Sequence, residues 1–157
     1  MRLTLIVLAF VTGCSPASQD SAPSSDTAFA ALQERGAVAM GVDQYTSSHI
    51  FESLPDGGRI VLQRDSADSA GTSVIRAHMT DIATRFAVGD FSIPGAVHAR
   101  EVPGTRVMTA RAEHIRYLSD TLPHGGQLRI TTSDSSALAA IHQFLEFQRM
   151  DHREHGH

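Results

Sequence analysis

Two short segments of this chain almost repeat each other, and they constrain its fold more than any other feature. The first reads LPDGGRIVL from Leu54, and the second reads LPHGGQLRI from Leu122, 68 positions later. Proline followed closely by two glycines is a strong turn signal, and β-forming residues mixed with polar ones lie on both sides of it. Each segment therefore predicts a β-hairpin.

Each predicted hairpin is followed by a loop and then by apolar residues at helical spacing. The expected strands are 46–54, 59–65, 114–122 and 127–132, the main helices are 72–88 and 135–152, shorter helices cover 27–36 and 105–112, and 91–103 is irregular. Because the order strand, strand, helix occurs twice, the sequence predicts an α+β domain. Two ββα units would form a four-stranded antiparallel sheet with the helices packed on one face. The alternative is that the two turns resemble each other by chance.

The N-terminus has the pattern of an export signal. Arg2 is followed by an uncharged apolar run over 3–11, which is well short of the roughly 20 residues that a membrane-spanning helix needs. Val11-Thr12-Gly13-Cys14 then resembles the lipobox of bacterial lipoproteins. The resemblance implies cleavage before Cys14 and acylation of its thiol and its new amino group. More than one acyl chain is needed because a single chain binds membranes only reversibly.

These signals predict four segments and a location. We expect a signal peptide over 1–13, a lipid-anchored flexible tether over 14–36, the α+β domain over 37–152 and a histidine-rich tail over 153–157. The membrane, reached through the lipid, is the expected partner. Ser15 favours the outer membrane, facing the periplasm, if the source has two membranes. The alternative is an ordinary signal peptide that is cut after Ala17.

Composition excludes several functions. The 13 basic residues are all arginine, so a Schiff-base lysine and a Walker-type phosphate-binding lysine are ruled out. Cys14 is the single cysteine, which rules out an internal disulfide and four-cysteine metal sites. The net charge is −4 and no basic run occurs, so no nucleic acid is expected. No catalytic motif for serine hydrolases is present.

Nine histidines are the residues that could carry chemistry. Neutral imidazoles bind copper and zinc, and a methionine thioether beside them favours copper. The candidates for an internal metal site are His49, His78, His98, His142 and Met108, with Met40 as another thioether, and His152 begins a chelating spacing with His155 and His157. The alternative is that these histidines are hydrogen-bonded core residues and that the tail is solvated.

Several stretches of the domain together resemble a known group of proteins. They are MGVDQ from Met40, Thr46-x-x-His49-x-Phe51, Ile75-Arg76-x-His78, GDF from Gly89 with Pro94, and IHxFLxFQ from Ile141 with Asp151-His152. The chain resembles, over 37–152, a family of small exported bacterial proteins, some of which carry an aspartate carbamoyltransferase name. The resemblance implies no mechanism, but its segments include four of the histidine candidates.

Three functions follow as hypotheses. The first is a non-enzymatic envelope lipoprotein that binds a small ligand, copper or zinc above all, through its histidines. The second is a structural or protein-interaction lipoprotein whose histidines only pack. The third is a hydrolase, for which a histidine would have to bond both a serine hydroxyl and a carboxylate. Three histidines around one cavity would favour the first hypothesis, and an exposed apolar patch would favour the second.

Overall fold

The computed structural model of the chain describes residues 24–65 and 67–153. The predicted signal peptide, the lipidation site Cys14, the first part of the predicted tether and tail residues 154–157 lie outside these described residues. Within 24–65 and 67–153, no helix is both long enough and apolar enough to cross a membrane.

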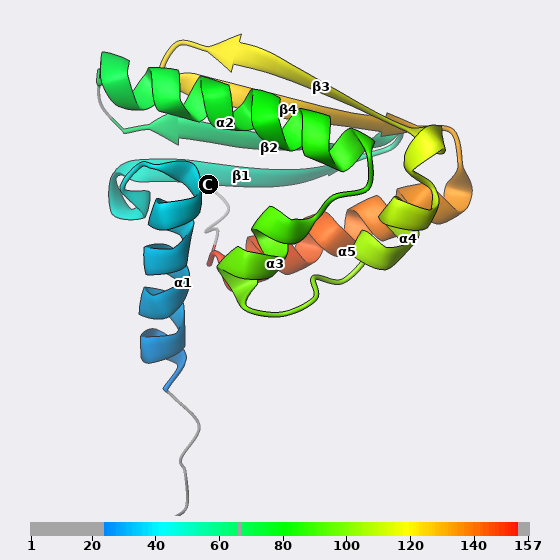
Figure 1. The fold of residues 1–157 in the computed structure, drawn as a ribbon, viewed down its shortest axis with the longest axis horizontal. Helices are drawn as coiled ribbons and strands as arrows, with labels where there is room; N and C mark the ends of the chain where they lie inside the picture. Colours follow the sequence, from blue (N-terminus) through cyan, green and yellow to red (C-terminus); the bar gives the residue numbers. More distant parts are fainter. Residues whose placement is uncertain (1–23, 66, 154–157) are drawn as a thin grey trace, which may run out of the picture.

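A four-stranded antiparallel sheet forms the centre of the domain, as predicted (Figure 1). Its strands are β1 (Ser47–Leu54), β2 (Gly57–Arg64), β3 (Ile115–Leu122) and β4 (Gly125–Thr132), in the order β1-β2-β4-β3. Both strands of the second hairpin begin 68 positions after their counterparts, since β3 and β4 start at 115 and 125 and β1 and β2 start at 47 and 57. The two hairpins meet through β2 and β4, where Ile60 lies opposite Leu128.

Two long helices, α2 (Ser69–Ala87) and α5 (Ser135–Asp151), cover one face of the sheet (Figure 1). Asp68 and Asp134 begin these helices by accepting hydrogen bonds from backbone N–H groups of the first turn. Each helix packs mainly against the other unit's hairpin: α2 contacts β3 and β4, whereas α5 contacts β1 and β2. The fold class predicted from the repeat is therefore confirmed, with the two units packed crosswise.

The N-terminal helix differs from the prediction in length. We expected a short helix over 27–36, but α1 runs Ser25–Met40 and ends at Gly41, which has a φ of 71°. Gly36 lies inside this helix, and the absence of a side chain there lets Gln44 pack against it, since a β-carbon would come within 3.1 Å of the Gln44 side chain. From Ser25 onward, the segment predicted as a flexible tether is therefore helical.

A second difference lies between the two units, where we expected 91–103 to be irregular. The structure has a helix here, α3 (Ser92–His98), which is followed by α4 (Thr105–Ala110). Pro94 is compatible with α3 because it occupies the first turn, where backbone N–H groups have no partner inside the helix. Two single-turn 3₁₀ helices, η1 (Gln44–Thr46) and η2 (Ala112–His114), precede β1 and β3.

The paired glycines of the repeat are required by tertiary packing as well as by the turns. A β-carbon at Gly57 would lie 2.1 Å from the carbonyl oxygen of Ile130, and one at Gly125 would lie 2.0 Å from that of Leu62. Each first glycine therefore lets its hairpin approach the neighbouring central strand. The glycines occupy the same position in both hairpins because the same kind of contact is made twice, between β2 and β4.

Replacing Gly125 should destabilise the domain strongly. We expect Gly125→Ala to lower the free energy of unfolding by about 3 kcal/mol, because the added carbon overlaps a backbone oxygen that cannot move independently. Gly95→Ala is the matched control, since the nearest atom to its added carbon, the Arg100 carbonyl oxygen, is 3.7 Å away. Urea unfolding followed by circular dichroism measures both. Equal stability of the two variants would contradict the role given to Gly125.

Candidate functional site

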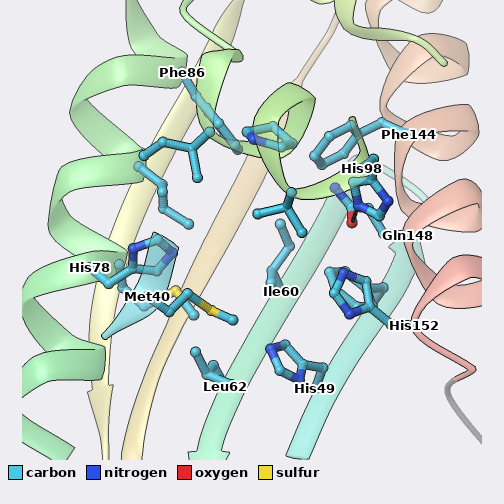
Figure 2. A pocket seen from close by; sticks show the side chains of 16 residues that line it. Met40, His49, Ile60, Leu62, His78, Phe86, His98, Phe144, Gln148 and His152 are labelled. Atoms are coloured by element: carbon cyan, nitrogen blue, oxygen red, sulfur yellow. Dashed lines mark hydrogen bonds between the residues drawn. The ribbon is translucent and has the colours of Figure 1, made fainter. Parts of the chain in front are cut away.

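A small cavity lies between the sheet and the helices, near the end of α5 (Figure 2). Its volume is about 70 Å³, and β1, β2, α2, α3, α5 and the last residue of α1 all contribute to its walls. The walls are mostly apolar, but four histidines interrupt them: His49, His78, His98 and His152. We call this cavity the histidine pocket.

His49 reaches the pocket because of the alternation along β1. Side chains two positions apart share a face of the sheet, so His49 and Phe51 both point toward the helices. Their rings stack with centroids 6.1 Å apart. The Nε2 atom of His49 is buried and has no hydrogen-bond partner. A buried polar atom without a partner costs about 1–3 kcal/mol, so this atom marks the pocket as a place where a ligand could bind.

His152 is the first residue after α5, and its ring closes the pocket against β1. Its centroid lies 5.2 Å from that of His49 and 5.3 Å from that of Phe51. In the sequence, this histidine groups equally well with the tail residues His155 and His157, which lie outside the described part of the chain. The structure instead brings it together with His49.

His98 is the last residue of α3, and both of its ring nitrogens are already bonded. Nδ1 lies 2.5 Å from a carboxylate oxygen of Asp151, and Nε2 lies 2.7 Å from the side-chain oxygen of Gln148. The ring stands perpendicular to that of His152 at 5.2 Å. His98 is therefore better placed to position His152 than to bind a ligand directly.

His78 and Met40 form another wall of the pocket. His78 comes from the inner side of α2, and Met40 is the last residue of α1. In the view of Figure 2, the Met40 side chain lies between the rings of His78 and His49. A thioether and the imidazoles thus line the same cavity.

Two predicted candidates lie elsewhere. His142, on α5, donates from Nε2 to the carbonyl oxygens of Leu54 and Gly57, at 2.9 and 3.1 Å, and so ties the β1–β2 turn to the helix. Met108, on α4, is fully buried in the core, and neither residue is among those that line the pocket. His142 is a candidate because it lies at the edge of an apolar helix stripe, and Met108 because it is a thioether near His98 in the chain. Neither property shows which part of the core a side chain reaches.

Two further residues, Gln148 and Asp151, shape the site, although no pattern in the sequence marks them. Gln148 lies on the apolar stripe of the last helix, and Asp151 has the appearance of a solvated surface acid. In the structure both hold His98, and Asp151 also accepts a hydrogen bond from Arg100 at 3.3 Å. No local signal identifies these roles, since His98 lies about 50 residues earlier in the chain.

Burial lowers the pKa of three of the pocket imidazoles, those of His49, His78 and His152. It lowers the pKa of His49 to about 4, with a further contribution from nearby His78. Burial also lowers the pKa of His152 to about 3, helped by His49 and His98. The pKa of His78 is lowered by burial too, although Asp81 opposes the shift. Neutral imidazole is the form that coordinates metals.

The pocket offers few ligands, and its geometry is the main guide to its function. Among the described residues, no three His, Cys, Asp or Glu side chains are grouped so that they could hold a metal ion. Any metal would therefore be bound with few protein ligands or with the help of a thioether.

No family model, curated protein or solved structure matches this chain.

The neutral histidines should make stability depend on pH. The pKa of His49 is lower in the folded state than its usual 6.5. Its contribution to the free energy of unfolding is therefore fully present above pH 6.5 and is lost as the pH falls toward 4. Between pH 7.5 and 5, His49 alone should lower the free energy of unfolding by about 2 kcal/mol. Urea unfolding at both pH values measures this loss.

His49→Phe tests the origin of this effect, because phenylalanine keeps an aromatic ring and cannot be protonated. We expect the loss of stability between pH 7.5 and 5 to be smaller by about 2 kcal/mol in this variant. His124→Ala, in the exposed turn between β3 and β4, should keep the wild-type dependence. If His49→Phe loses as much stability as the wild type, its burial as a neutral group is contradicted.

Proposed function

We propose that this protein is a lipid-anchored envelope protein that binds a transition metal ion in the histidine pocket. The observation that carries the proposal is the buried Nε2 of His49, which lacks a hydrogen-bond partner beside a cavity. A buried nitrogen without a partner raises the free energy of the folded state unless a ligand bonds to it. The ring of His152, whose centroid lies 5.2 Å from that of His49, supplies a second imidazole.

The size of the pocket supports an ion over an organic ligand. Sites for organic ligands are typically roughly 300–1,000 Å³, whereas this cavity has a volume of about 70 Å³. Such a space holds an ion or a molecule of a few atoms. The lowered pKa values of His49 and His152 keep both rings in the metal-binding form at neutral pH.

The surroundings of His98 argue for binding and against hydrolysis. Serine-type catalysis needs a histidine between a carboxylate and a hydroxyl nucleophile. His98 instead lies between the carboxylate of Asp151 and the amide of Gln148, so both of its ring nitrogens are bonded and neither is left to bond a hydroxyl. We therefore regard the protein as a binding protein.

A second candidate function is protein interaction through the face of the sheet that α2 and α5 leave open. Ile50 and Leu118 project from this face, and their residues are 41% and 69% exposed. Exposed apolar side chains on a sheet can mark a contact surface. They are separated by charged residues such as Glu52, Arg59 and Arg129, so the metal-binding proposal has the stronger support.

Metal binding should raise thermal stability in a way that depends on His49. The test uses the chain from residue 14, without a purification tag, with Cys14→Ser, His155→Ala and His157→Ala so that neither the thiol nor the tail chelates. We call this variant the parent. Cu(I), Ag(I), Cu(II) and Zn(II) are each added while unfolding is followed. At a hundredfold excess over Kd, a bound ion adds about 2.7 kcal/mol to stability.

We expect at least one of these ions to raise the unfolding temperature of the parent. His49→Phe in the parent should abolish the shift, and His124→Ala should preserve it, because His124 lies in an exposed turn away from the pocket. The proposal fails if no ion shifts the parent, or if His49→Phe responds as the parent does.

The lipid anchor has an independent test. When the complete gene is expressed in a bacterium, we expect the protein in the membrane fraction, with the mass of a chain that begins at a triacylated Cys14. Cys14→Ser should leave it unacylated and out of the detergent-extracted fraction. Equal membrane association of the two proteins would contradict anchoring at Cys14.

A further inference from the structure

Resting on the metal-binding function proposed above, we infer that the histidine pocket selects a soft monovalent cation, Cu(I) or Ag(I), over Zn(II). The ligands would be the imidazoles of His49 and His152 and the thioether of Met40. Charge, ligand number and ligand softness each support this choice.

The first argument is the charge of the pocket. None of the residues that line it is a carboxylate. Asp151 lies behind His98 and is bonded to both His98 and Arg100, and Asp81 acts on His78 from outside the lining. A cation in this cavity would therefore keep its whole charge among neutral ligands. The cost of moving an ion out of water rises with the square of its charge, so a divalent ion costs roughly four times as much as a monovalent one of equal size.

The second argument is the small number of ligands. Zn(II) sites in proteins are almost always tetrahedral, with three or four protein ligands of nitrogen, sulfur or carboxylate type. The described residues contain no such group of three, and the two ring nitrogens of His98 are already bonded. Cu(I) and Ag(I) accept low coordination numbers, which two imidazoles and a thioether satisfy.

The third argument is the softness of Met40. Thioether sulfur binds Cu(I) and has little affinity for Zn(II). Met40 ends α1 and lines the same pocket as His49 and His152. The other thioether in the lining, Met79, is 2% exposed and packs in the core cluster. Gly41 ends α1 directly after Met40, so this thioether is carried by the last residue of the helix.

The experiment compares Ag(I), a redox-stable substitute for Cu(I), with Zn(II) in calorimetric titrations of the parent. We expect one Ag(I) per chain, bound at least about 100-fold more tightly than Zn(II), which corresponds to about 2.7 kcal/mol. Met40→Leu should weaken Ag(I) binding about tenfold, because leucine keeps the volume and removes the sulfur. Met108→Leu is the matched control, since Met108 is fully buried outside the pocket, and it should leave the affinity unchanged.

The possible results separate the two proposals. If Zn(II) binds as tightly as Ag(I) and both depend on His49, the metal-binding function stands and the selectivity inferred here is wrong. If Met40→Leu and Met108→Leu bind Ag(I) equally well, the thioether is not a ligand, which also overturns the inference. If neither Ag(I) nor Zn(II) binds, the selectivity inferred here is wrong, and the metal-binding function fails as well if Cu(I) and Cu(II) leave the unfolding temperature of the parent unchanged. The unfolding temperature of each variant without metal confirms that it is folded.

Discussion

The antiparallel pairing of β2 with β4 is the interaction on which the rest of the structure depends. It joins the two hairpins into one sheet, and glycines at 57 and 125 allow the close approach that it requires. Once the hairpins are joined, each long helix covers the hairpin of the other unit. A single ββα unit would leave the apolar side of its hairpin without its main cover, so the two units are expected to fold together.

The histidine pocket is a consequence of this crosswise packing. Because α5 lies over β1, the end of the helix brings His152 over His49, although the two residues are far apart in the chain. The α3 helix fills the space between α1 and α5 and supplies His98, whose partners Asp151 and Gln148 both belong to α5. The site therefore joins residues from both units and from the insertion between them, and it exists only in the complete domain.

Burying several imidazoles together has an energetic cost that packing alone does not explain. Their low pKa values mean that the fold holds them neutral, and the Nε2 of His49 has no partner to offset its burial. An aliphatic residue at this position would fill the space without that cost. This contrast separates His49 from His142, whose ring nitrogen donates to two carbonyl oxygens and ties down a turn. His142 thus has a role in the fold, whereas for His49 we propose a role in binding a ligand.

Local patterns in the sequence determined the elements and the class of fold, because turn signals, alternation and helical periodicity depend on neighbouring residues. The hairpins and the two long helices could be predicted in this way. Only the tertiary structure decided which histidines meet. Sequence position alone makes His78, His142 and Met108 candidates for one site, whereas the crosswise packing puts the first in the pocket, the second beneath a turn and the third in the core. That choice depends on contacts between residues distant in the chain, which no local pattern encodes.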